Sequence, residues 1–263
     1  MDWYGCAESG RRIMYRFFVE KQQIDTVAKK VTITGSDVNH IRNVLRMEKG
    51  EEVSVIADGD DNEYRCAVGA FTDDTAELDL LFIKKSNVEL PCEITLYQAL
   101  PKSDKMELVI TKSVELGASR IVPVATKRAV VKLDAAGADR KQKRWAAISE
   151  AAAKQSKRAV IPEVGHVMTM AEAIEDCRDF EVKIIPYELA DPDSMDTTRK
   201  LIGSIRPGDR VAVFIGPEGG FTDEEIELAT KAGFKSITLG RRILRTETAG
   251  PVVLSWLIYD LER

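Results

Sequence analysis

The sequence predicts an α/β protein in which a small β-rich region precedes a larger region of alternating strands and helices. In residues 14–88, short runs rich in Val, Ile, Thr and aromatic residues are separated by turn-forming clusters. From residue 89 onward, apolar runs of strand length alternate with stretches whose apolar residues recur at helical spacing. Such alternation is typical of a mostly parallel sheet covered by helices on both faces.

The first region is expected to form a small domain resembling a β-barrel. One short helix is expected to interrupt its strands, with Ser36 as the N-cap and Val38, Ile41 and Leu45 on one side. The expected strands cover residues 31–33, 53–57, 64–71 and 76–83.

The second region should place several loops along one edge of its sheet. Ligands bind beyond the carboxyl ends of strands in such sheets, so the loops after Ile185, Ile215 and Leu239 are expected to converge. The expected strands cover residues 93–100, 121–124, 183–187, 211–215 and 236–239, and the expected helices cover 102–117, 139–158, 171–177, 223–233 and 252–261.

The loop after residue 215 has the pattern of a ligand-binding turn. Gly216 and Pro217 end the strand, and the next helix begins at Thr222, which forms a capping box with Glu225. The glycines of this loop allow a ligand to approach the backbone N–H groups closely. The alternative interpretation is a turn whose glycines satisfy backbone geometry alone.

The loop after Gly240 carries more polar groups than a surface loop requires. A helix cap would need only Thr246 or Thr248, with Pro251 tolerated in the first turn. The charged and hydroxyl residues of this loop are Arg241, Arg242, Arg245, Thr246, Glu247 and Thr248. Together with the glycine loop, they indicate a ligand site.

Composition favours an ordinary globular protein. The chain has 263 residues, of which 44% are hydrophobic and 31% charged, and it contains no apolar run near the roughly 20 residues of a membrane span. Residues 1–13 have no signal-peptide pattern and are interpreted as an N-terminal extension. The four cysteines and two histidines lack metal-type spacing, so we expect no metal and a reducing cytoplasmic location.

Charge is distributed unevenly along the chain. The formal net charge is −5, but residues 127–158 carry ten Lys and Arg against three acidic residues, a local charge of +7. This segment is a candidate surface for a polyanion such as RNA. The alternative is a solvated helix face.

These motifs together resemble the RsmE family of 16S ribosomal RNA methyltransferases in the SPOUT superfamily. The resemblance rests on YRFFV, HIRNVLRMEKGEEV, LPKSDKMELVITKSVELGASRIVPV, EAAAKQSKR, FIGPEGGF and LGRRILRTETA, which occur in this order. It implies a PUA-like domain over residues 14–88 and a SPOUT domain with a deep trefoil knot over residues 89–263. Such knots are rare exceptions to unknotted connectivity.

The resemblance also implies a reaction and its partners. The enzyme would be a homodimer, joined through its C-terminal domain, that transfers methyl from S-adenosylmethionine to N3 of one uridine. The substrate would be 16S rRNA or the 30S subunit. The apolar run over residues 252–258 would then form core or dimer interface.

The resemblance assigns the cofactor to three loops. Its expected contacts are Pro186, Tyr187, Glu188, Gly216, Pro217, Glu218, Gly219, Leu239, Gly240, Ile243, Leu244, Arg245, Thr246, Thr248 and Ala249. Gly250 and Pro251 differ from a common form of the family's sequence, so the residue at which the last helix begins is left open.

Two residues of the third loop are candidate catalytic groups. Arg245 is expected to stabilise the negative charge that develops on the uracil oxygens. Glu247 is the nearest carboxylate for proton removal, although it could instead pair with Arg241 or Arg242 and shape the loop.

Phosphate contacts are expected from arginines in both regions. Arg42 and Arg46 share a helix face, for which a solvated surface is the alternative. The full set of candidates is Arg16, Arg42, Arg46, Arg128, Arg144 and Arg158.

Three other functions compete with this interpretation. The first is a related enzyme that methylates a ribose 2′-hydroxyl, and the second is a noncatalytic RNA-binding or assembly protein. The third is a nucleotide-binding enzyme that uses residues 216–220 as a phosphate loop, which is disfavoured because no Gly-Lys-Ser/Thr follows.

Overall fold

The computed structural model describes residues 14–57, 60, 62–187 and 195–262. The interpreted N-terminal extension and Glu188 lie outside these ranges. Contacts divide the chain into two compact units, with the division between Asn87 and Val88. Each unit is described by itself.

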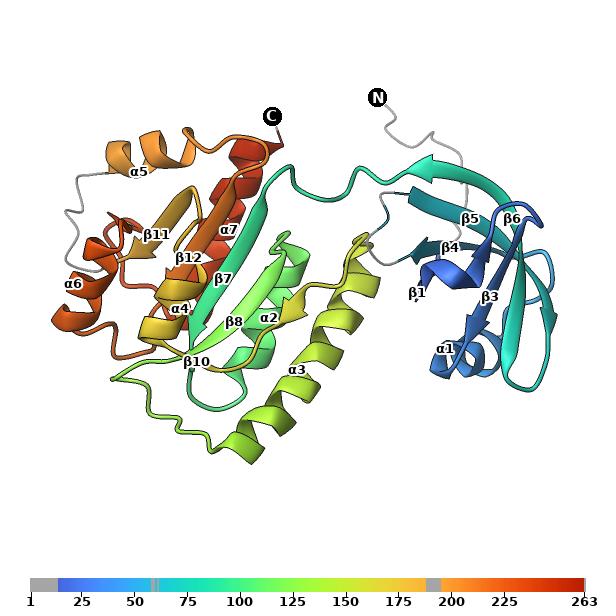
Figure 1. The fold of residues 1–263 in the computed structure, drawn as a ribbon, viewed down its shortest axis with the longest axis horizontal. Helices are drawn as coiled ribbons and strands as arrows, with labels where there is room; N and C mark the ends of the chain where they lie inside the picture. The colour runs from blue at the N-terminus through green and yellow to red at the C-terminus, as the bar shows by residue number, and fades with distance from the viewer. Residues whose placement is uncertain (1–13, 58–59, 61, 188–194, 263) are drawn as a thin grey trace, which may run out of the picture. The chain divides into compact units, whose positions relative to one another are not determined.

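The N-terminal unit is built on a six-stranded sheet of order β1-β4-β5-β6-β3-β2 (Figure 1). β1 pairs with β4 in parallel, and the other neighbours are antiparallel. Phe17, Ile33, Val55 and Leu78 pack in its buried core. The strands are β1 (Arg16–Val19), β2 (Ile24–Asp25), β3 (Lys30–Thr34), β4 (Glu52–Ala57), β5 (Asn62–Phe71) and β6 (Thr75–Lys85), and one 3-10 turn, η1, covers Lys21–Gln23.

The short helix of this unit differs from its prediction. Ser36 lies inside α1 (Ser36–Asn39), and Gly35, with φ of 72°, occupies the N-cap without a side-chain hydrogen bond. The chain then continues as a π-helix, η2 (His40–Val44). Ser36 was therefore wrong as a cap: Gly35 adopts the positive φ that a side chain disfavours, and the helix begins at Ser36, one residue earlier than predicted. Val38 and Ile41 are buried as expected.

A buried carboxylate joins β1 to β5 in the N-terminal unit. Glu63 Oε2 lies 2.7 Å from Arg16 Nη2, and both side chains are only 6% exposed. Arg65 and Lys84 each place a nitrogen 3.4 Å from Glu63 Oε1. Removing one partner of such a pair leaves an uncompensated buried charge, so this cluster couples the two strands strongly.

The C-terminal unit contains a seven-stranded sheet of order β10-β8-β7-β12-β11-β13, with β9 paired to β8. Every pair in this sheet is parallel among the described residues. The strands are β7 (Glu93–Ala99), β8 (Arg120–Ala125), β9 (Glu163–Val164), β10 (Met168–Thr169), β11 (Val182–Pro186), β12 (Arg210–Ile215) and β13 (Lys235–Ile237).

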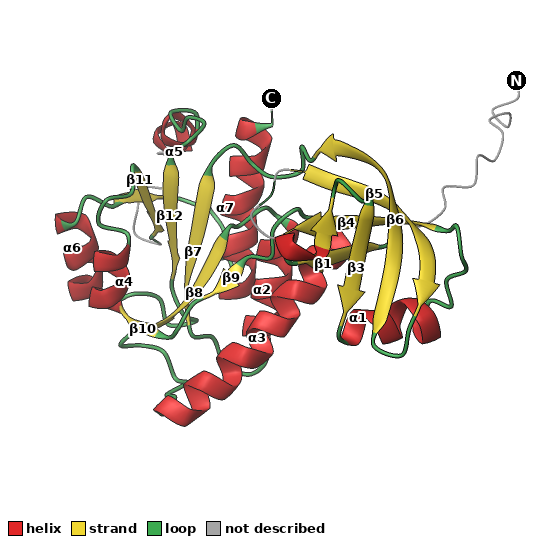
Figure 2. Ribbon diagram, turned by 45° about the vertical axis from the view of Figure 1, so that its right-hand side comes forward, coloured by secondary structure: helices red, strands yellow, loops and turns green. Residues whose placement is uncertain are grey.

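Helices cover both faces of this sheet (Figure 2). On β12, Val211, Val213 and Ile215 face the core that contains residues of α2, α5 and α7. Ala212 and Phe214 face the core that contains residues of α4 and α6. The helices are α2 (Lys105–Glu115), α3 (Ala135–Ser156), α4 (Met170–Asp176), α5 (Met195–Ile202), α6 (Asp223–Lys231) and α7 (Thr246–Leu261).

Two helix starts differ from their predictions. α3 begins at Ala135 because the Asp134 carboxylate accepts a hydrogen bond from Gly137 N at 2.8 Å, whereas the sequence predicted a start at residue 139. α7 begins at Thr246, with Arg245 as the N-cap and no side-chain capping bond. Neither predicted hydroxyl therefore caps α7. α5, β9 and β10 were not predicted from the sequence.

A buried arginine closes the end of α3. Arg158 is 4% exposed, and its Nη1 donates to the carbonyl oxygens of Val114 and Ala118 at 3.1 and 2.6 Å. Its Nε donates to Glu89, whose Oε1 also accepts from Ala159 N at 2.7 Å. Arg158 thus holds α2, α3 and the start of the unit together.

The Glu63 cluster predicts a pH-dependent stability. Burial alone would raise the pKa of Glu63, but the Ser54 hydroxyl and the charges of Arg16 and Lys84 hold it below its ordinary value of 4.5. A lowered folded pKa gives stability that is present above the unfolded pKa and lost as pH falls through the folded one. Hydrogen exchange at β4 and β5 should therefore show easier opening below pH 4.5 in the wild type. Glu63→Gln should be less stable at neutral pH and less pH-dependent. Equal pH slopes for the two proteins would contradict this.

Candidate functional site

The three predicted loops leave the same edge of the sheet. β12, β11 and β13 are neighbours and run parallel, so their carboxyl ends point the same way; Figure 1 shows β11 beside β12. The start of the first loop is also bonded to the end of β13, because Tyr187 N donates to Ile237 O at 3.1 Å. The expected convergence of residues that are far apart in sequence is thereby confirmed.

A buried hydroxyl ties the third loop to two strand ends. Thr246 is 5% exposed, and its Oγ1 donates to Gly216 O at 2.6 Å. The same oxygen accepts a hydrogen bond from Gln98 Nε2 at 2.8 Å. Because Gln98 lies on β7 and Gly216 follows β12, the first turn of α7 is fixed to both neighbouring strands. We refer to this arrangement as the Thr246 clasp.

Gln98 is a site residue that the sequence analysis missed. It is fully buried in the otherwise apolar strand β7, and a polar residue in such a strand was the available signal. Its amide nitrogen also donates to Ala99 O at 3.0 Å. Its Oε1 is buried and has no hydrogen-bond partner among the described residues. Buried acceptors are rarely left unpaired, so this oxygen is a candidate ligand contact.

The glycine loop is packed closely as well as open to a ligand. A Cβ on Gly216 would lie 3.2 Å from the Phe221 ring, and one on Gly219 would lie 3.3 Å from Arg128 Cβ. The Arg128 guanidinium donates to the carbonyl oxygens of Gly219 and Phe221, at 3.0 Å each. A side chain at either glycine would need its neighbour to shift slightly, and Arg128 fixes the backbone of the loop.

Lys105 connects the second and third loops through two carboxylates. Its Nζ lies 3.2 Å from Glu218 Oε1 and 3.2 Å from Glu247 Oε2. Lys102 N also donates to Glu218 Oε1 at 3.1 Å. Hydrogen bonding to Glu218 and Glu247 raises the pKa of Lys105, so its charge is retained.

The partner of Glu247 is Lys105 rather than Arg241 or Arg242. Burial alone would raise the pKa of Glu247, but its own backbone N–H and Lys105 hold the pKa below its ordinary value. A carboxylate with a lowered pKa is a weak base. These contacts favour the loop-shaping role considered for Glu247.

The predicted capping box at the start of α6 is confirmed. Thr222 accepts from Glu225 N at 3.3 Å, and Glu225 Oε2 accepts from Thr222 N at 2.8 Å. The other carboxylate oxygen of Glu225 accepts from Lys127 N at 2.8 Å, and the Tyr187 hydroxyl donates to Asp223 at 3.1 Å. The start of α6 therefore joins the loop after β11 to the loop after β8.

The remaining predicted cofactor residues occupy different environments along the third loop. Gly240 has φ of 95°, a conformation that favours glycine, while Leu244 packs against the core. Ile243 is 82% exposed, which is unusual for a large apolar side chain. Arg245 and Thr248 are exposed, and Ala249 is buried at 8%. Pro186 and Leu239 are half-buried, and Pro217 is buried.

The arginines predicted to bind RNA divide into two groups. Arg16 and Arg158 are buried in ion pairs, and Arg128 donates to the glycine loop. The buried positions of Arg16 and Arg158 argue against phosphate contacts from either residue. Arg128 is exposed as well, but its guanidinium is bonded to the glycine loop, and the other exposed candidates are Arg42, Arg46 and Arg144. Arg46 follows the end of η2 with φ of 52°, so the prediction that it shares a helix face with Arg42 was wrong. Arg144 also pairs with Glu107 at 2.6 Å.

Exposed cations gather on and before α3. This helix contains much of the basic segment 127–158, and the side chains of Lys132, Arg140 and Lys143 are exposed. Within the described ranges, no group of three or more His, Cys, Asp or Glu residues is placed to hold a metal ion. No described helix is both long and apolar enough to cross a membrane.

Two family models match the chain. An RNA methyltransferase domain matches residues 88–258, and an RNA methyltransferase PUA domain matches residues 33–81. The first match covers more than half of the chain and includes all three loops.

Curated relatives match over almost the whole chain. The ribosomal RNA small subunit methyltransferase E of Bacillus subtilis is 35% identical over 252 residues, which cover 95% of this chain and 98% of the relative. The protein of the same name from Mesomycoplasma hyopneumoniae is 33% identical and covers 94% of this chain and 100% of the relative.

Solved structures agree with these matches. A ribosomal RNA small subunit methyltransferase E from Neisseria gonorrhoeae, bound to S-adenosyl methionine, is 30% identical with a TM-score of 0.79. The match covers 94% of this chain and 97% of the other. The sequence and structural matches agree over both units and the three converging loops, and the chain belongs to the RsmE family of ribosomal RNA small subunit methyltransferases.

Proposed function

We propose that this protein transfers the methyl group of S-adenosylmethionine to N3 of a uridine in the 16S rRNA of the small ribosomal subunit. The observation that carries the proposal is the convergence of three loops at one sheet edge, fixed by the Thr246 clasp. The substrate is inferred from the names of the relatives, and the cofactor is inferred from the Neisseria gonorrhoeae structure.

The residues at this edge fit S-adenosylmethionine. The space next to Gly220 in the glycine loop is open, and Gln98 Oε1 is a buried acceptor without a partner among the described residues. The exposed apolar side chain of Ile243 offers a surface for the adenine ring. When bound, the cofactor supplies an electrophilic methyl group. Holding a reactant in a fixed position supplies a large part of such a rate enhancement.

Arg245 is the residue proposed to stabilise charge during the reaction. Uridine N3 must lose its proton, and negative charge then spreads onto the carbonyl oxygens of the base. The Arg245 backbone is fixed at the N-cap of α7, and the side chain is exposed. A fixed cation directed at developing charge is an effective form of catalysis. Glu247, held by Lys105, is proposed to position this loop.

The finer features of the fold belong to the same proposal. We propose that residues 14–88 form a PUA-like RNA-binding domain and that residues 89–263 form a trefoil-knotted SPOUT domain. Family-model matches over residues 33–81 and 88–258 support this division. The knot is proposed from the resemblance to the SPOUT superfamily.

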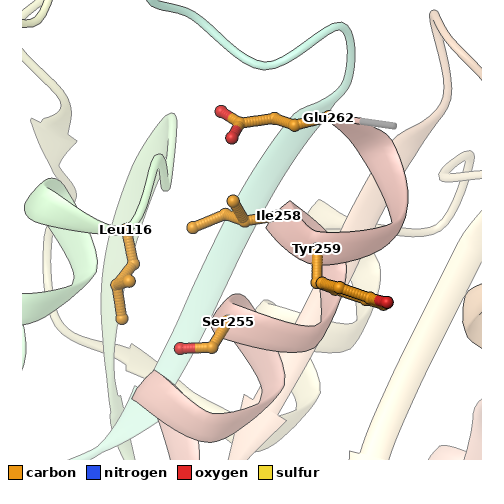
Figure 3. Close-up of a pocket in the computed structure, with 5 residues that line it drawn as sticks. All are labelled: Leu116, Ser255, Ile258, Tyr259 and Glu262. Carbon is orange, nitrogen blue, oxygen red and sulfur yellow. The ribbon is translucent and has the colours of Figure 1, made fainter.

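A homodimer through α7 is also part of the proposal. Leu116, Ser255, Ile258, Tyr259 and Glu262 line a surface cavity of about 570 Å³ between α7 and the end of α2 (Figure 3). Tyr259 is 75% exposed, and large exposed aromatic side chains are enriched at protein interfaces. The other face of α7, with Val253, Leu254 and Leu257, is buried in the core. The apolar run thus contributes to the core and offers a surface to a second subunit.

RNA contacts are proposed for the exposed cations alone. Arg42, Arg46 and Arg144, with the exposed cations near α3, are suited to phosphate groups. We propose that the enzyme acts in the cytoplasm, where 16S rRNA and 30S subunits are its substrates.

The proposed function can be tested on ribosomes from a strain that lacks this gene. Mass spectrometry of digested 16S rRNA should show loss of 3-methyluridine, and purified protein with S-adenosylmethionine should restore it on isolated rRNA, 30S subunits or both. Restoration of a ribose-methylated nucleoside would identify the alternative target. A protein that binds no S-adenosylmethionine by calorimetry would contradict the enzyme assignment.

Removing the clasp hydroxyl should weaken cofactor binding. Thr246→Val deprives Gly216 O of a donor and Gln98 of an acceptor, and each unpaired buried group costs about 1–3 kcal/mol. We expect lower stability and roughly tenfold weaker S-adenosylmethionine binding by calorimetry, a change of about 1.4 kcal/mol. Thr230→Val is the control, because its hydroxyl bonds only to its own helix, at Ile226 O. Cofactor affinity unchanged in Thr246→Val would refute the structural role of the clasp.

Removing the Arg245 charge should slow turnover. Arg245→Ala should lower kcat by about 10²–10³-fold, the cost of losing one charge-stabilising donor, while cofactor binding remains close to normal. Arg242→Ala, on the same exposed loop, is the control and should retain most of the activity. Methyl transfer to 30S subunits is the measurement. Full turnover by Arg245→Ala would remove this residue from the proposed mechanism.

A further inference from the structure

A second cavity lies beside the proposed cofactor loops. It has a volume of about 170 Å³ and is enclosed by the end of β7, the start of α2, the segment before α3 and the first half of α3. Leu100, Met106 and Trp145 contribute an apolar floor, and each of them is 2–3% exposed. Ser103, Asp104 and Lys141 contribute polar groups to the lining.

Two lysines that are chain neighbours of the lining residues Ser103 and Asp104 contact the glycine loop. Lys102 N and Lys105 Nζ both contact Glu218 Oε1, at 3.1 and 3.2 Å. Ser103 and Asp104 lie between these two lysines in the chain. A group held in the cavity would therefore lie next to the loop that is proposed to hold the cofactor.

The local backbone at the cavity is unusual. Ser103 has φ of 56°, a left-handed conformation that is unfavourable for residues other than glycine. Asp104 occupies the N-cap of α2, yet its carboxylate makes no capping hydrogen bond. Strained backbone and unused polar groups of this kind are often found at functional sites.

The size of the cavity matches one six-membered ring. An apolar protein cavity of about 150 Å³ is large enough to hold benzene, and a pyrimidine has a ring of the same size. Uracil carries two carbonyl oxygens and one N3–H group. The lining offers an ammonium and a hydroxyl as donors and a carboxylate as an acceptor. Lys141 Nζ lies 5.8 Å from the Trp145 ring centroid, so a cation and an aromatic ring are already adjacent.

We propose that this cavity receives the uracil ring that is methylated, after the nucleotide has turned out of the RNA structure. The proposal rests on the proposed function and adds the subsite that selects the base. Enzymes that modify a base commonly extrude it into a close-fitting pocket and recognise it by hydrogen bonds and apolar contacts. Lys132, Arg140 and Lys143 are exposed and are neighbours in the chain of the lining residues Val131, Leu133 and Lys141, so they are suited to the flanking phosphates.

Filling the cavity is the direct test. Val131 lines it, whereas the neighbouring Val130 does not and is 66% exposed. Val131→Trp should lower kcat/KM for 30S subunits that lack the modification by about tenfold or more, the size expected for loss of one stacked base. The affinity of this variant for S-adenosylmethionine, measured by calorimetry, should stay within about twofold of the wild-type value, which is a small change in binding free energy. Val130→Trp should resemble wild type in both measurements.

A second variant covers the case in which Val131→Trp does not fold. Ser103→Gly removes the hydroxyl at a φ that glycine adopts readily, so it should melt no lower than wild type. It should also lower kcat/KM for 30S subunits without changing cofactor affinity. Lys141→Ala should lower kcat/KM for 30S subunits more than Lys143→Ala does, because Lys143 is an exposed cation of α3 outside the cavity lining.

The outcomes separate this inference from the proposed function. Wild-type protein that fails to methylate 30S subunits would contradict the proposed function itself. Active wild-type protein with Val131→Trp and Ser103→Gly matching Val130→Trp would overturn the base pocket alone. Loss of cofactor affinity in the cavity variants would assign the cavity to S-adenosylmethionine and would equally overturn the proposal.

Discussion

The hydrogen bonds of the Thr246 hydroxyl are the interaction on which the candidate site depends. One buried oxygen donates to Gly216 O and accepts from Gln98, so α7, the glycine loop and β7 share a single junction. Lys105 joins the same loops near the surface through Glu218 and Glu247. The buried junction sets the backbone geometry, and the charged one, which is more exposed to water, adds a weaker restraint.

This arrangement explains why a ligand site forms at this sheet edge. Parallel strands bring their carboxyl ends to one edge of the sheet, but the loops that follow these strands would be mobile without further restraint. Here the described parts of the loops are tied to their neighbours: Tyr187 to Ile237 at the end of β13, Arg128 to Gly219, and Thr246 to Gly216. The backbone is therefore preorganised before a ligand arrives, which lowers the entropic cost of binding.

Much of the fold could be predicted from patterns among neighbouring residues. Contacts between residues far apart in the chain could not. The Thr222–Glu225 capping box and the apolar strand before Gly216 depend on adjacent residues, and both are present. Gln98 and Thr246 are 148 residues apart, so no local pattern could pair them. Arg158 looked like a surface cation because the carboxylate and carbonyls that surround it come from distant segments. The family resemblance located the loops, but only the structure showed how they are joined.

The central claim is that these three joined loops hold the cofactor. Hydrogen–deuterium exchange with and without S-adenosylmethionine measures this at each peptide, because a bound ligand slows the opening of the backbone that it contacts. We expect added protection at Tyr187, at residues 216–220 and at residues 239–249. Protection confined to residues 100–104 and 131–145, with none in the three loops, would contradict it.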